Sequence, residues 1–313
     1  MTKKAIIFPG QGSQNLGMLS DHYKRFKEVK ETFTEANDTL GFDLWQIIQN
    51  DENKLNQTEY TQPAILASSI AIWRVLMSHS SITQMNLTKA GHSLGEYSAL
   101  CSAESINFDD ALRLVQLRGQ LMQVAVTDKA CGMSAILALT NEQVIECCNA
   151  AKYIGIVEPA NFNSSGQVII SGELEAVEKA NQIAKKMGAK RIQLLPVSVP
   201  SHCSLMKSAA KKFAIALEKI TIKSPKTPIL HNYDVASHDN INDIRNALIK
   251  QLYSPVQWRK TIEKMADLGI KSFTECGANR VLTVLNKRIV KNLNHQDTAT
   301  VDAINTLFEQ IKI

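Results

Sequence analysis

Apolar and polar positions alternate along the chain in the periods of strands and helices. An apolar run at 5–8 stops at the glycine- and proline-containing turn 9–14, which predicts a buried first strand. Strands that alternate with helices are typical of a mostly parallel sheet covered by helices. The same periodicities predict helices at about 20–37, 64–77 and 107–126, and strands at 87–90 and 270–274.

The middle third of the chain has a different order of elements. Strands are predicted at 133–139, 154–162, 167–171 and 191–199, and helices at 140–151 and 173–187. The resulting order, β-α-β-β-α-β, is the ferredoxin-like pattern. We therefore expect residues 128–199 to form a small subdomain, inserted between residues 1–127 and 200–313 of a larger α/β domain.

Composition narrows the class of protein. Hydrophobic residues make up 44% and charged residues 21% of the 313 positions, which is typical of a folded globular chain. The net charge of +5 is too diffuse for nucleic-acid binding, and no apolar run is long enough to span a membrane. The six cysteines lack disulfide or zinc spacing, so reduced thiols, no bound metal and a cytoplasmic location are expected.

A candidate nucleophile lies in the segment Gly91-His92-Ser93-Leu94-Gly95. This segment matches the G-x-S-x-G nucleophile elbow, in which flanking glycines let a strand turn sharply into a helix and expose the serine hydroxyl. A helix is predicted to start at 96–100, whereas the preceding segment Leu87-Thr88-Lys89-Ala90 is a weak strand. An ordinary serine in a glycine-rich turn is the alternative interpretation.

The nucleophile would need a base, and histidine is the usual one at neutral pH. Of the seven histidines, His202 follows the apolar run 194–199 and a Pro-Ser turn. It is therefore predicted just past a buried strand, where the catalytic groups of α/β folds gather. The alternative is that His202 caps a helix beginning near Leu205.

Arg118 is the third candidate, because it falls in the middle of an apolar helix stripe. A buried cation is costly unless an anion compensates it. That anion is either a structural partner within the protein or a ligand carboxylate, which the guanidinium binds with two parallel hydrogen bonds. The stripe is formed by Ala111, Leu114, Val115, Leu121, Met122 and Ala125.

The loop Gly10-Gln11-Gly12 is a weak candidate for a dinucleotide site. Asn15 replaces the third glycine of that motif, so we reject this interpretation. The main-chain N–H groups of such a turn are instead available to an oxyanion.

Together these segments resemble the bacterial malonyl-CoA:acyl carrier protein transacylases along nearly the whole chain. The family's fold, an α/β-hydrolase-like parallel-sheet domain with an inserted ferredoxin-like subdomain, agrees with the predicted order of elements. The matching segments are 8–14, 61–64, 91–97, 118–119, 161–164, 196–202 and 251–256.

The resemblance implies a role for each candidate. Ser93 would be the acylated nucleophile, His202 its base and Arg118 the anchor of the malonyl carboxylate. The main-chain N–H groups of Gln11 and Leu94 would form the oxyanion hole, and the side-chain amide of Gln251 would orient the histidine. The chain departs from the family near 277–279, where Ala278-Asn279 replaces Pro-Gly; Asn279 can adopt a left-handed conformation.

The implied activity is transfer of a malonyl group from malonyl-CoA to the phosphopantetheine thiol of holo acyl carrier protein, in fatty acid biosynthesis. The coenzyme A thioester would be a substrate, no cofactor would be bound, and a monomer is expected. A serine esterase or thioesterase with the same elbow is the alternative, and it would need an acidic residue between Ser93 and His202. A catalytically idle scaffold for the carrier protein is the third hypothesis.

Overall fold

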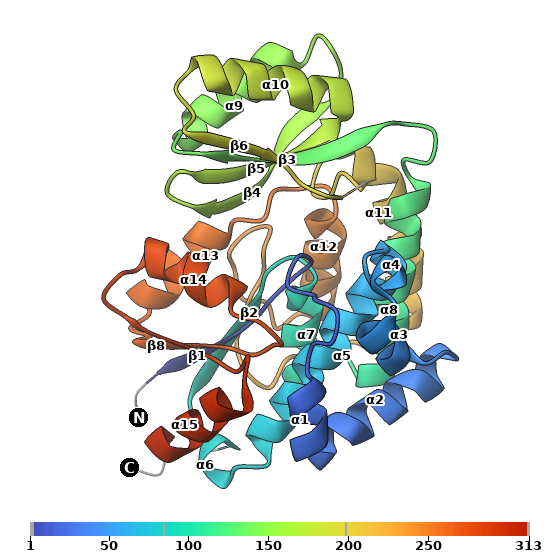
Figure 1. Cartoon of the computed structure of the whole chain (residues 1–313), viewed down its shortest axis with the longest axis vertical. Coiled ribbons are helices and arrows are strands. Elements are labelled where there is room, and N and C mark those ends of the chain that lie inside the picture. Colours follow the sequence, from blue (N-terminus) through green and yellow to red (C-terminus); the bar gives the residue numbers. More distant parts are fainter. Residues whose placement is uncertain (1–2, 84, 198, 312–313) are drawn as a thin grey trace.

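A parallel sheet of five strands organises the larger part of the molecule (Figure 1). The computed structural model describes residues 3–83, 85–197 and 199–311. The strand order is β7-β2-β1-β8-β9, and every neighbouring pair is parallel. The strands are β1 (Lys4–Phe8), β2 (Leu87–Gly91), β7 (Ile229–Leu230), β8 (Ser272–Glu275) and β9 (Asn294–Asp297).

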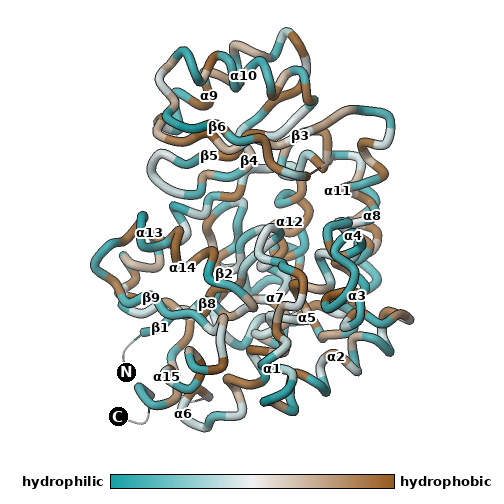
Figure 2. Tube along the Cα trace, in the orientation of Figure 1, coloured by the Kyte–Doolittle hydropathy of each residue, from teal (hydrophilic) through white to brown (hydrophobic). Residues whose placement is uncertain are grey.

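Helices cover both faces of this sheet. Hydrophilic and hydrophobic residues are interspersed along outer helices such as α2, as expected for helices with one buried side (Figure 2). Within the described ranges, every helix is too short or too polar to span a bilayer. The helices of this part are α1 (Ser20–Arg25), α2 (Lys27–Leu40), α3 (Leu44–Asn50), α4 (Glu52–Leu55), α5 (Thr58–Met77), α6 (Ser80–Thr83), α7 (Gly95–Ser102), α8 (Phe108–Val124), the short 3-10 helix η1 (Ser204–Met206), α11 (Lys207–Lys219), α12 (Ile241–Gln251), α13 (Trp258–Asp267), α14 (Val281–Ile289) and α15 (Val301–Ile311).

Successive residues of β1 enter different hydrophobic cores, because side chains alternate across a strand. Ile6 and Phe8 pack in the core that includes α5, α7 and α8. Ala5 and Ile7 pack in the opposite core, with side chains of α13 and α14. Burial of each large apolar side chain contributes about 1.5–3 kcal/mol, so both faces anchor the central strand.

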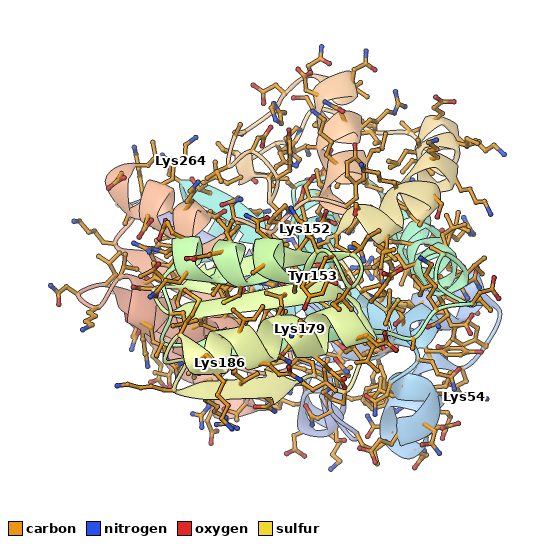
Figure 3. The ribbon with its side chains drawn as sticks, turned by 90° about the horizontal axis from the view of Figure 1, so that it is seen from above. Lys54, Lys152, Tyr153, Lys179, Lys186 and Lys264 are labelled. Carbon is orange, nitrogen blue, oxygen red and sulfur yellow. The ribbon has the colours of Figure 1, made fainter. Side chains whose placement is uncertain are left out.

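A second, antiparallel sheet lies above the first in Figure 1. Its strand order is β4-β5-β3-β6, and its own apolar core includes side chains of α9 and α10. These helices cover its outer face, where Lys152, Tyr153, Lys179 and Lys186 are labelled in Figure 3. The predicted order β-α-β-β-α-β is confirmed. The elements are β3 (Cys131–Leu137), α9 (Asn141–Ala151), β4 (Val157–Ser164), β5 (Gln167–Glu173), α10 (Leu174–Lys186) and β6 (Arg191–Leu194).

Strand β4 joins the antiparallel sheet to the rest of the molecule. The main-chain N–H of Phe162 donates to the oxygen of Val256 at 2.9 Å, and the N–H of Val256 donates to Ala160 at the same distance. Asn161 thereby forms a parallel bridge with Val256. The side chains of β4 that follow this bridge are held opposite the carboxyl edge of the parallel sheet.

The largest differences between predicted and observed bounds concern three elements. The last strand of the small sheet ends at Leu194 rather than at residue 199; it is an edge strand with mostly exposed side chains, and Pro196 cannot donate to a ladder. The helix predicted at 64–77 begins at Thr58, which places Pro63 inside it. The helix predicted at 20–37 is two helices, because Phe26 is extended.

The loop after β8 contains Asn279, a residue type that can adopt a left-handed conformation. Asn279 is not left-handed; its Oδ1 accepts a hydrogen bond from the N–H of Arg280 at 2.9 Å. The buried carboxylate of Glu275 accepts from the N–H groups of Leu282 and Thr283 at 3.0 and 2.6 Å, and so fixes the start of α14.

Candidate active site

The candidate nucleophile lies at the carboxyl edge of the parallel sheet. Strands β1 and β2 end in register at Phe8 and Gly91, so the loops that follow them meet. Ser93 has a φ of 52°, which places it in the left-handed region of a sharp turn. A Cβ atom on Gly91 would lie 1.8 Å from the carbonyl of Gly95, and one on Gly95 would lie 2.1 Å from the oxygen of Phe8. Only glycine fits at these two positions.

Ser93 and His202, which are far apart in the sequence, are in direct contact. The Oγ atom of Ser93 lies 2.7 Å from Nε2 of His202. Nδ1 of the ring lies 2.7 Å from the main-chain oxygen of Gln251, which can only accept, so Nδ1 carries the proton and Nε2 accepts from the serine. Burial, together with the nearby cation of Arg118, lowers the pKa of His202 to about 3. The imidazole is therefore neutral and able to take a proton.

The expected role of the Gln251 side chain needs correction. Its amide does not orient the imidazole, because the main-chain carbonyl of Gln251 does. Helix α12 ends at Gln251, and carbonyl groups in the last turn of a helix have no intrahelical donor. The side-chain Nε2 of Gln251 instead donates to the main-chain oxygen of Ser93 at 2.9 Å and to Oε2 of Glu96 at 2.8 Å.

Arg118 is buried beside the nucleophile, with 2% of its surface exposed. Its Nη1 donates to Oε1 of Gln62 at 2.8 Å, and its Nη2 donates to Oε1 of Gln251 at 3.1 Å. Nη2 also lies 3.4 Å from Oγ of Ser93. Among the described residues no carboxylate forms an ion pair with Arg118, so a structural ion pair is not what compensates its charge.

The two expected oxyanion donors, Gln11 and Leu94, line the same cavity as Ser93. Gln11 follows β1, and Leu94 follows Ser93. Within the described part of the chain, neither main-chain N–H donates a hydrogen bond to the protein. Both N–H groups are therefore available to a ligand oxygen.

A cavity of about 520 Å³ opens above these groups, between the two sheets. Its lining includes Ser93, His202 and Arg118, and Asn163 contributes from β4. Nε2 of His92 lies 2.8 Å from Oδ1 of Asn163, so a hydrogen bond at the cavity wall joins the elbow to the antiparallel sheet. Val284 and Arg288 of α14 also line it. A volume of this size is ordinary for a pocket that binds a small molecule.

Two site residues were not predicted from the sequence. Asn232 accepts from the N–H of Ser93 at 2.7 Å and donates to the oxygen of Gly91 at 2.6 Å, so it holds the elbow. The signal was the short apolar run 229–230, strand β7, which ends two residues before Asn232. Gln62 binds Arg118, and its signal was an amide immediately before Pro63 and the apolar run of helix α5.

The acidic residue that an esterase triad would need is not in place. Asp109 accepts from Thr39 at 2.9 Å, and Asp110 contacts Asn107 at the start of α8. Among the described residues, no carboxylate contacts either ring nitrogen of His202. Nor does the described chain contain a group of three or more His, Cys, Asp or Glu side chains placed to hold a metal ion.

Comparison with known sequences gives matches over nearly the whole chain. The chain is 48% identical over 306 residues to the malonyl CoA-acyl carrier protein transacylase of Salmonella typhimurium, covering 97% of this chain and 96% of the relative. It is 47% identical over 310 residues to the protein of the same name from Haemophilus influenzae, covering 99% of both chains.

Solved structures agree with the sequence match. A malonyl-transacylase in complex with a type II PKS acyl-carrier protein has a TM-score of 0.95 and 47% identity, over 99% of this chain and 100% of that one. The malonyl CoA-acyl carrier protein transacylase of Coxiella burnetii has a TM-score of 0.96 and 43% identity, over 100% and 98% of the two chains. The acyl transferase domain model matches residues 5–307. The chain therefore belongs to the acyl transferase family.

Proposed function

We propose that this chain is a malonyl-CoA:acyl carrier protein transacylase of fatty acid biosynthesis, which transfers malonyl groups through an ester of Ser93. The observation that carries the proposal is the buried guanidinium of Arg118, 3.4 Å from Oγ of Ser93 and without a carboxylate partner among the described residues. An acyl group on Ser93 that ends in a carboxylate would bring the missing anion to this cation.

The first transfer forms the ester. Oγ of Ser93 attacks the thioester carbonyl of malonyl-CoA while Nε2 of His202 takes the hydroxyl proton, over the 2.7 Å that separates these atoms. The C–S bond then breaks, and coenzyme A leaves as a thiol with the proton from His202. The main-chain oxygen of Gln251 holds the ring in the required tautomer.

The second transfer reverses these proton movements. The phosphopantetheine thiol of the carrier protein gives its proton to His202, and its sulfur attacks the ester carbonyl. The C–O bond to Ser93 breaks, and the serine oxygen recovers the proton. The two thiols use the same site in turn, so the kinetics should be ping-pong.

The oxyanion of each tetrahedral intermediate would be bound by the N–H groups of Gln11 and Leu94. Their support is that both groups line the cavity and have no acceptor among the described residues. Donors fixed in advance where negative charge develops are worth about 2.7–4 kcal/mol of transition-state stabilisation each.

Mass measurement of the intact protein tests the proposal. Incubation with malonyl-CoA should add one malonyl group to the protein, and holo acyl carrier protein should then remove it and become malonylated. Ser93→Ala should gain no mass. Steady release of free malonate without the carrier protein would identify an esterase instead, and a wild-type protein that gains no mass would identify a scaffold.

Further expectations concern the whole chain. We propose that residues 1–127 and 200–313 form an α/β-hydrolase-like domain and that 128–199 form the ferredoxin-like subdomain. Their support is the separate sheet and core of the middle segment. The six free thiols support a cytoplasmic enzyme. A monomer without a bound cofactor is expected, which light scattering and the mass and absorbance of the purified protein would test.

A further inference from the structure

The carboxylate of Glu96 is completely buried directly behind the nucleophile elbow. Its Oε1 lies 2.7 Å from Nδ1 of His231. Its Oε2 accepts from the N–H of Asn232 at 3.1 Å and from Nε2 of Gln251 at 2.8 Å. Two donors from the loop after β7 and one from the end of α12 therefore converge on one buried carboxylate, and the chemistry proposed above does not use it.

Glu96 decides which way the amide of Gln251 points. In the structure, the NH₂ group of Gln251 donates to two acceptors, the main-chain oxygen of Ser93 and the carboxylate of Glu96. Its oxygen is thereby left to accept from Nη2 of Arg118. A reversed amide would set its oxygen against these two acceptors and its NH₂ group against the guanidinium, so all three contacts would become repulsive.

This orientation in turn holds the guanidinium of Arg118. Two neutral amide oxygens, from Gln62 and Gln251, accept from its two terminal nitrogens at 2.8 and 3.1 Å. They fix the plane of the guanidinium without neutralising its charge. A charge that is held in place but unpaired is what binding an acyl carboxylate requires.

We propose that Glu96 is a positioning residue for acyl selectivity: by orienting the amide of Gln251, it holds Arg118 in the geometry that accepts a carboxylate-bearing acyl group. This inference rests on the proposed malonyl transfer. Loss of Glu96 should therefore affect malonyl groups more than acetyl groups, which carry no carboxylate for Arg118 to bind.

The test compares acylation of the protein by malonyl-CoA and by acetyl-CoA. Glu96→Ala should lower the ratio of kcat/KM for malonyl-CoA to that for acetyl-CoA at least tenfold, mainly through a higher KM for malonyl-CoA. Glu96→Gln should keep the ratio within about threefold of wild type. Its amide oxygen can still accept from Gln251, and the ring of His231 can move its proton to Nε2, which has no partner among the described residues.

His231→Ala is the matched control for a structural effect. It removes a donor to Glu96 on the side away from Gln251, so it should lower the melting temperature and leave the selectivity ratio unchanged. Glu96→Asp keeps a carboxylate but moves it away from Gln251, because the side chain is one methylene shorter. This variant replaces Glu96→Ala in the test if Glu96→Ala does not fold. We expect it to lose less selectivity than Glu96→Ala, in the same direction.

The outcomes separate this inference from the proposed function. If the wild-type protein takes up no malonyl group, the proposed function fails and this inference fails with it. If the wild type transfers malonyl groups but folded Glu96→Ala, or Glu96→Asp in its place, keeps the wild-type ratio, only the role of Glu96 is overturned. An equal loss in Glu96→Gln and Glu96→Ala would also overturn it.

Discussion

Nη2 of the buried Arg118 side chain lies 3.4 Å from Oγ of Ser93, and both residues line the cavity between the two sheets. The proximity has two consequences. A cation so close to Ser93, the proposed nucleophile, can bind the far end of a short acyl group carried by that serine. It also disfavours a second positive charge, so it helps to keep the neighbouring His202 neutral.

Removal of the cation should change the preference for acyl groups. We expect Arg118→Ala to lower kcat/KM for malonyl-CoA by about 10²–10⁴-fold, because two hydrogen bonds to a charged group contribute about 1.5–3 kcal/mol each. Activity towards acetyl-CoA should fall much less, so relative preference for acetyl groups should rise. Steady-state kinetics with both thioesters measures the change.

Arg113→Ala is the control for this substitution. Arg113 lies on the same helix, α8, but its side chain is exposed on the outer side. Arg113→Ala should leave kcat/KM unchanged for both malonyl-CoA and acetyl-CoA. Equal losses for malonyl-CoA and acetyl-CoA in Arg118→Ala would show that Arg118 serves the structure rather than selection.

The acylation rate should be nearly independent of pH over the range in which an ordinary histidine titrates. Burial and Arg118 lower the pKa of His202 to about 3, so the free enzyme keeps a neutral base throughout the interval from pH 8 to pH 5. The value of kcat/KM reports groups of the free enzyme. We expect a flat profile for the formation of malonyl-enzyme, measured by quenched mixing and mass analysis.

The Arg118→Gln variant tests the electrostatic part of this explanation. Without the cation, the pKa of His202 should rise, and the acid limb of the acetylation profile should move to higher pH. Desolvation is the larger cause of the shift, so the pKa should stay below its usual value. A wild-type profile with an inflection near pH 6.5 would contradict the prediction.

The glycine after the nucleophile should be indispensable. A Cβ atom on Gly95 would lie 2.1 Å from the main-chain oxygen of Phe8, and backbone cannot yield as a flexible side chain can. We expect Gly95→Ala to destabilise the fold by about 1–3 kcal/mol or more and to slow acylation of Ser93, because the turn must shift. Thermal unfolding and mass gain from malonyl-CoA measure the two effects.

Gly188→Ala provides the comparison. Gly188 has a φ of 95° but no atom within 4 Å of the added Cβ, and it follows α10 on the far sheet. Its replacement should lower stability by about 1–2 kcal/mol through backbone strain alone and leave acylation unchanged. If both variants acylate normally, the close packing at Gly95 does not determine the position of Ser93.

The sequence was informative where one local pattern carried the chemistry. The spacing of Gly91 and Gly95 around Ser93 predicted the elbow, and a lone cation in an apolar helix stripe predicted that Arg118 is buried. These signals need only neighbouring residues. These signals could not show that Arg118 has no carboxylate partner. The structure shows this for the described residues.

Contacts made by several strand and helix ends together were beyond local patterns. Asn232 follows β7 and Gln251 ends α12, and the two residues meet the elbow only because the chain folds around the parallel sheet. Likewise no pattern indicates that Gln251 orients His202 through its main chain. Every residue has a main-chain carbonyl that can accept a hydrogen bond, so the residue type gives no signal for this contact. The sequence could therefore suggest only the side-chain amide.

Lys89 explains why strand β2 was weakly predicted, although it lies inside the sheet. The side chain is buried, its Nζ donates to the oxygen of Ser102 at 2.7 Å, and the ring of Trp73 lies 4.1 Å away. The ring favours the ammonium, but burial dominates and lowers the pKa of Lys89 to about 7. In the sequence, lysine interrupts the apolar pattern of this strand, but in the folded chain its side chain is buried with the core residues.

This lysine should make stability depend on pH in a defined direction. Its pKa is lower in the folded than in the unfolded chain, so between pH 7 and 10.5 the unfolded chain binds more protons and stability rises with pH. Lys89→Met lacks this dependence. We expect the variant to gain stability relative to wild type at pH 7, by an amount of the order of a few kcal/mol, and to lose that advantage towards pH 10.5. Denaturant unfolding of both proteins at several pH values measures the difference in their free energies of unfolding, in which the contributions of other titrating groups cancel. If this difference stays constant between pH 7 and 10.5, Lys89 is charged in the folded protein.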